Sequence, residues 1–110
     1  MAYAAELTAA AERDLQRIID HIAAHDLPDR AQHVLDAIEA RIDALETAPD
    51  RGSYPRELAA LGIRDFREVF FKPYRIIYRV FPDDQIIRVF LIADGRRSLR
   101  RLLEQRLLEA

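Results

Sequence analysis

Two different periods divide the hydrophobic positions of this 110-residue chain. Over residues 9–25, apolar side chains recur at i, i+3, i+4, i+7 and i+8, which predicts one buried stripe of an amphipathic helix. Thr8 is placed to cap that helix, and Pro28 fits the first position of a second helix that ends before Pro49. The two segments predict an antiparallel helical hairpin, preceded by a short strand over residues 3–7.

The period changes from 3.6 to 2 after residues 49–62, where two prolines and two glycines predict a loop and "RELAAL" allows one helical turn. Three strands are predicted, over residues 63–71, 74–81 and 86–93. Ser98 is placed to cap a last helix through about Glu109. The order β-α-α-β-β-β-α predicts an α+β fold, a two-layer domain with the helical hairpin packed on a mostly antiparallel sheet.

The composition is that of one globular domain over residues 1–110, with half of the residues hydrophobic and a third charged. The absence of Cys excludes disulfides and thiolate sites, and it favours a reducing, cytoplasmic location. No apolar run approaches the ~18 residues of a membrane span, so we expect no membrane partner. His21 and His25 are four residues apart, a spacing that could hold a metal, but they and His33 are expected to be surface polar residues, and no P-loop is present. The sequence therefore predicts no metal and no cofactor.

Charge is unevenly distributed along the chain. Residues 1–62 carry 12 acidic side chains and 6 Arg, whereas residues 63–110 carry 7 acidic side chains, 10 Arg and one Lys. Sixteen of the 17 basic residues are Arg, whose planar fork suits carboxylate and phosphate groups. The basic second half is compatible with an anionic partner.

The strand over residues 74–81 has an apolar face that suits the helices and a second face that carries Arg75, Ile77, Arg79 and Phe81. A symmetric turn after it would place Arg79 opposite Arg88. A three-residue connection before it would place Asp65 opposite Arg79, and Phe66, Glu68 and Phe70 on the core face. Four arginines would then share one face: Arg67, Arg75, Arg79 and Arg88. Two interpretations remain open, an ordinary solvated sheet face and an anion-binding or partner-binding surface.

Five motifs narrow the family. They are "LTAAAERDLQRIIDHI" at 7–22, "AP" at 48–49, "FRE" at 66–68, "YRIIYRV" at 74–80 and "DGRRSLRRLLEQRLL" at 94–108. With these motifs in this order along almost the whole chain, the sequence resembles the RelE/ParE superfamily, the toxins of type II toxin-antitoxin systems of the plasmid-stabilisation type. The resemblance implies the same fold and a protein that poisons its own cell until an antitoxin, usually encoded by the adjacent gene, binds it.

Two activities occur in that superfamily. ParE-like members inhibit DNA gyrase, and the resemblance slightly favours this activity. RelE-like members enter the ribosome and cut mRNA, in which case the chain would be an endoribonuclease. A non-toxic RNA-binding or interaction domain is a third reading, and the resemblance is compatible with a homodimer or with a hetero-oligomer that contains the antitoxin.

The match to the RNase pattern is partial. An RNase would use Arg75, Arg67 and Arg97, but Val69 and Leu103 stand where a second basic residue and a tyrosine are expected. Because Arg stays protonated, such a site would have no general base. The predicted target- or anion-binding surface comprises Arg67, Arg75, Arg79, Arg88, Arg96 and Arg97. The predicted antitoxin-binding residues are Ile77, Phe81, Phe90, Leu99 and Leu103.

Overall fold

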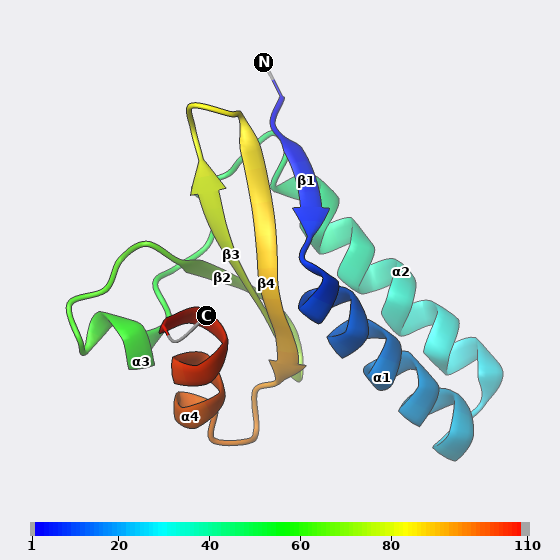
Figure 1. Cartoon of the computed structure of the whole chain (residues 1–110). Coiled ribbons are helices and arrows are strands. Elements are labelled where there is room, and N and C mark those ends of the chain that lie inside the picture. The colour runs from blue at the N-terminus through cyan, green and yellow to red at the C-terminus, as the bar shows by residue number, and fades with distance from the viewer. Residues whose placement is uncertain (1, 109–110) are drawn as a thin grey trace.

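A four-stranded sheet lies between a long helical hairpin and a set of short helices in the computed structural model, which describes residues 2–108 (Figure 1). The elements are β1 (Ala4–Leu7), α1 (Ala9–His25), α2 (Pro28–Ala44), α3 (Arg56–Ala59), β2 (Arg67–Phe71), β3 (Tyr74–Phe81), β4 (Ile86–Asp94), α4 (Arg100–Leu103) and the π-helical turn η1 (Glu104–Leu108). This architecture confirms the predicted α+β fold. Within the described residues, none of the helices has the length and apolar character needed to cross a membrane.

The helical hairpin begins where its capping residues predict. The Ala11 N–H donates to the Thr8 hydroxyl at 3.1 Å, which satisfies one of the free amides at the start of α1. Pro28 is the first residue of α2, where its missing N–H breaks no helical hydrogen bond.

The strand order is β1-β4-β3-β2, with β1 parallel to β4 and the other two pairs antiparallel. The predicted mostly antiparallel sheet is therefore confirmed. β2 begins at Arg67, four residues later than predicted, because residues 63–66 form irregular backbone that leads from the loop into the sheet.

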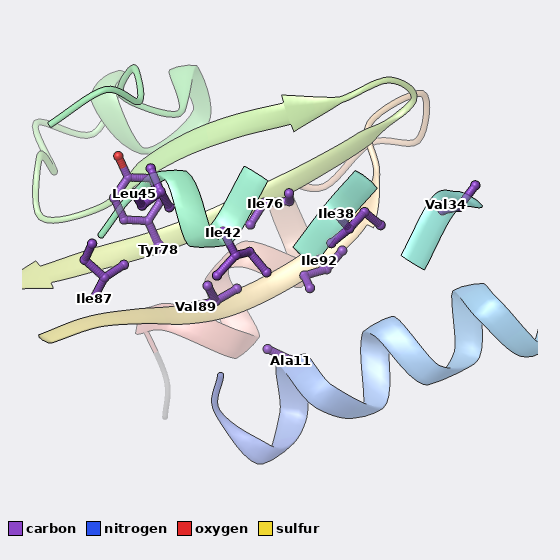
Figure 2. Close-up of a cluster of buried hydrophobic side chains, with 10 residues drawn as sticks. All are labelled: Ala11, Val34, Ile38, Ile42, Leu45, Ile76, Tyr78, Ile87, Val89 and Ile92. Atoms are coloured by element: carbon purple, nitrogen blue, oxygen red, sulfur yellow. The ribbon is translucent and has the colours of Figure 1, made fainter. Parts of the chain in front are cut away.

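The main core lies between the sheet and α2. Figure 2 shows side chains of α2 meeting those of β3 and β4, with Ala11 of α1 beside them. Ile76 and Tyr78 belong to this cluster, and Tyr74 and Val80 pack against it, which confirms the predicted helix-facing side of β3. Each fully buried aliphatic side chain contributes roughly 1.5–3 kcal/mol of hydrophobic free energy.

A second, smaller core covers part of the opposite sheet face. Its buried members are Leu58, Phe66, Ile77, Leu91, Leu99 and Leu103. The last helical segment therefore docks on its own sheet. Its predicted cap is wrong, because Leu99 is the N-cap residue, no side chain caps the helix and α4 begins at Arg100. The predicted end at Glu109 lies outside the described residues.

A partly buried ion pair connects this last segment to α1. Arg106 donates to both carboxylate oxygens of Asp14, at 2.8 and 3.0 Å, and to the Phe90 carbonyl at 3.1 Å. Asp14 also accepts the Ile92 N–H at 3.1 Å. Since β1 pairs with β4 only as far as Val89, these two side chains satisfy backbone groups on the edge of β4 beyond β1.

Candidate functional site

The β2–β3 connection decides which side chains stand beside Arg75. It has two residues, so Phe71 pairs with Tyr74, Phe70 with Arg75 and Glu68 with Ile77. The predicted three-residue connection is therefore too long by one residue, and this error places every β2 side chain on the wrong face of the sheet. In the structure, Glu68 and Phe70 lie on the same face of the sheet as Arg75.

Arg67 consequently does not lie on the same face of the sheet as Arg75. It lies opposite Tyr78, and its guanidinium donates to the Gly52 carbonyl at 2.8 Å and to the Tyr54 hydroxyl at 3.1 Å. The prediction that four arginines share one face is wrong for Arg67. The slip of one residue in the register is the cause.

Arg75 is held in a buried triad with two carboxylates. Its Nε donates to Glu68 at 2.7 Å, and its two Nη atoms donate to both oxygens of Glu57 at 2.6 and 2.8 Å. The side chains of Arg75, Glu57 and Glu68 are 8%, 17% and 7% exposed. Arg75 is therefore not the exposed residue that the strand pattern predicted.

Two elements bring the carboxyl groups of the triad to Arg75. The one-turn helix α3 in the loop brings Glu57 over the sheet, and β2 places Glu68 beside Arg75. The hydrogen bonds from Arg75 lower the pKa of Glu57, and the same bonds raise the pKa of Arg75. Arg75 stays protonated and Glu57 stays ionised near neutral pH, so the Arg75 cation is bound by the Glu57 anion and also donates to the Glu68 carboxyl group.

A hollow of about 520 Å³ opens beside the triad, which we call the Phe70 pocket. Its lining residues are Tyr54, Arg56, Glu68, Phe70, Lys72, Pro73, Arg75, Gly95 and Arg96. Arg96 donates to both oxygens of Asp94, at 3.0 and 2.6 Å, and this contact lowers the pKa of Asp94. The pocket combines an aromatic and aliphatic lining with four cationic side chains.

Arg79 and Arg88 form a different surface, the Phe81 patch, which comprises Arg79, Phe81 and Arg88. The two arginines are directly opposite across β3 and β4, as predicted. Their guanidinium carbons lie 5.1 and 4.9 Å from the centre of the Phe81 ring, which favours both cations. Arg88 pairs with Glu6 at 2.6 Å and Arg79 with Asp65 at 3.6 Å. Asp65 thus contacts Arg79, although it precedes the paired residues of β2.

The three arginines predicted for RNA cleavage line three different hollows. Arg75 lines the Phe70 pocket, Arg67 lines a hollow of about 480 Å³ with Arg64 and Arg79, and Arg97 lines one of about 260 Å³ with Leu102. The sequence did not indicate Glu57 or Phe70 as site residues. Alternation across a two-residue "KP" connection would have identified Glu68 and Phe70, whereas no local pattern marks Glu57.

Three of the predicted antitoxin-binding residues are buried within the chain. Ile77, Leu99 and Leu103 are 0%, 3% and 0% exposed, because the last helical segment packs over Ile77. Phe81 and Phe90 are partly exposed. Among residues 2–108, no group of three or more His, Asp or Glu side chains is placed to hold a metal ion.

A family model decides which proteins this chain resembles in sequence. The family described as "ParE toxin of type II toxin-antitoxin system, parDE" matches residues 5–99, which is most of the chain. The chain belongs to this ParE toxin family. The predicted superfamily is confirmed, and the protein is the toxin of a type II toxin-antitoxin system. No curated protein is significantly similar to it in sequence.

Solved structures share the fold of this ParE-family chain at low sequence identity. A chromosomal ParDE toxin-antitoxin system from P. aeruginosa aligns with a TM-score of 0.68 and 19% identity, over 84% of this chain and 96% of that chain. A mutant of the E. coli toxin RelE in the free state aligns with a TM-score of 0.67 and 13% identity, over 99% and 97%. The toxin-antitoxin complex RelBE2 from Mycobacterium tuberculosis gives 0.60 and 20%, over 86% and 92%. Both branches of the superfamily thus share this fold.

Proposed function

We propose that this toxin acts by binding, as a ParE-like inhibitor of DNA gyrase, and that an antitoxin encoded by the adjacent gene neutralises it. The observation that carries the proposal is the triad of Arg75, Glu57 and Glu68. A residue that held a scissile phosphate would need a free guanidinium, but here every guanidinium nitrogen of Arg75 donates to a carboxylate.

The surroundings of Arg75 also oppose phosphate binding. A phosphate would have to displace Glu57 from its bidentate contact and remain beside the Glu68 carboxyl group. Leu103, at the position where the RNases have a tyrosine, is 0% exposed. Arg75 therefore offers no free guanidinium to a phosphate, and Leu103 offers no hydroxyl that could take part in activating the 2′-hydroxyl.

The Phe81 patch supports a binding mechanism. Arginine and aromatic side chains are enriched among the residues that dominate protein-protein affinity. The side chains of Arg79 and Arg88 are 41% and 36% exposed. We assign target contact to this patch, where two cations flank one aromatic ring, with Arg67 as a neighbour through the hollow that it lines with Arg79.

The test compares two targets with the same purified toxin. We expect it to inhibit supercoiling by purified gyrase and to leave mRNA intact on translating ribosomes. Arg79→Ala combined with Arg88→Ala should abolish gyrase inhibition while the melting temperature stays close to that of the wild type, since exposed ion pairs contribute little to stability. Cleavage of mRNA on ribosomes, with gyrase unaffected, would replace this proposal by the RelE-like activity.

A further inference from the structure

Two aromatic side chains stand exposed at the Phe70 pocket. Tyr54 is 39% exposed and Phe70 is 45% exposed, and both line the hollow of about 520 Å³. Large apolar side chains that gather at a concave surface mark interaction sites more strongly than scattered ones do. Pro73 extends the apolar lining. The pocket is therefore suited to receive an apolar side chain from a partner.

The cations around this pocket specify the charge next to that apolar side chain. Arg56 and Lys72 are exposed, and neither pairs with a carboxylate among residues 2–108. Arg96, in contrast, is already bound to Asp94. Two unpaired cations beside an apolar hollow favour a partner that carries acidic residues next to an apolar anchor.

The same charges disfavour a nucleic acid as the occupant. Glu68 lines the pocket, and Glu57 lies beside it in the triad with Arg75. A long polyanion in the pocket would lie close to both carboxyl groups. A short peptide segment would contact only the pocket and its two free cations.

The neighbouring edge of the sheet is already occupied, which limits how a peptide can bind. Ser53 exchanges two backbone hydrogen bonds with Glu68, at 3.1 and 2.8 Å. Arg41 donates to the Phe70 carbonyl at 3.1 Å. A partner strand added at β2 would have to displace these groups, so insertion of a side chain is the available mode.

We propose that the Phe70 pocket receives an apolar side chain of the antitoxin, and that flanking acidic residues of the antitoxin pair with Arg56 and Lys72. This inference rests on the antitoxin partnership proposed above and is independent of the target. The pocket lies at the Tyr74 end of β3, whereas the Phe81 patch lies at its other end. The chain thus carries separate surfaces for antitoxin and target.

The experiment measures the affinity of the purified product of the adjacent gene for toxin variants by titration calorimetry. We expect Phe70→Ala and Lys72→Glu each to weaken binding by about tenfold or more, as loss of an anchor or a facing charge does. Leu27→Ala is the matched control, because Leu27 is 73% exposed and lies between α1 and α2, outside the pocket lining. This control should bind as the wild type does.

The outcomes separate this inference from the proposed function. If the wild type binds and both pocket variants bind within twofold of it, the pocket assignment is wrong while the toxin-antitoxin pairing stands. If the wild type does not bind the adjacent gene product, the partnership and this inference fail together. A fluorescent single-stranded RNA is titrated in parallel. Should Phe70→Ala remove RNA binding and leave antitoxin binding unchanged, the pocket takes nucleic acid instead.

Discussion

Arg75 and Arg79 lie on the same face of the same strand, β3, yet they have different environments. The side chain of Arg75 is 8% exposed and donates to two carboxyl groups. The side chain of Arg79 is 41% exposed and forms a longer ion pair, at 3.6 Å, with Asp65. The difference comes from what covers each end of β3. Near Tyr74, β2 and α3 supply Glu68 and Glu57, while near Phe81 the face remains partly open. Identical residues four apart thus form a buried ion-pair triad at one end of the strand and a partly exposed cation at the other.

The largest loss of stability is expected when Arg75 is removed. Arg75→Ala leaves two buried carboxylates without a counter-ion, and breaking a buried pair in this way costs about 3–5 kcal/mol. We expect urea denaturation to show a loss of that size in the free energy of unfolding. An effect of this size would not be expected of an exposed arginine, because exposed substitutions usually change stability by less than about 0.5 kcal/mol.

A matched variant makes that result specific. Arg75→Lys keeps one positive charge but cannot donate to Glu57 and Glu68 with the planar fork of arginine. It should recover only part of the lost stability. A stability of Arg75→Ala equal to that of the wild type would show that the triad does not hold the loop to the sheet.

A smaller effect is expected from Glu57 and depends on pH. Because Arg75 lowers the pKa of Glu57 below 4.5 in the folded chain, the unfolded chain binds more protons just below that pH. The contribution of Glu57 is therefore complete above pH 4.5 and is lost as pH falls through its folded pKa. Glu57→Gln should lose about 1.5–3 kcal/mol at pH 7, the contribution of a hydrogen bond to a charged group.

Other carboxylates also titrate in acid, so the pH test compares the unfolding free energies of wild type and Glu57→Gln at each pH. The gap in unfolding free energy between wild type and Glu57→Gln should shrink as pH falls below about 4.5. The unfolding free energy changes by about 2.303RT per pH unit for each proton by which the unfolded and folded states differ. If the difference between wild type and Glu57→Gln stays constant down to pH 3, the charge on Glu57 does not contribute to stability.

The helical hairpin and the sheet were predictable because their signals are local. Thr8 and Pro28 mark helix starts, and alternation along residues 74–81 assigns the two faces of β3. The symmetric turn also placed Arg79 opposite Arg88. These features depend on residues that are close in the sequence, where period and turn length carry the information.

The triad was not predictable by the same means. Glu57 lies in a loop without a period, 18 residues before its partner, and only the tertiary fold brings the two together. Glu68 was assigned to the wrong face because one residue of turn length reverses a whole strand. The leucines of the last helical segment showed an apolar stripe, but they did not indicate that this stripe packs over Ile77. Sequence alone therefore assigned Arg75 to the surface.

The smallest expected effect on stability is that of Arg79→Ala, at the exposed end of β3. Loss of the 3.6 Å pair with Asp65 and of the contact with Phe81 is offset by relief of repulsion from Arg88, directly across the ladder. We expect the free energy of unfolding to change by less than about 0.5 kcal/mol, as for most exposed substitutions. Gyrase inhibition should weaken nevertheless, because the Phe81 patch is assigned to the target. A large fall in melting temperature would show that Arg79, like Arg75, is primarily structural.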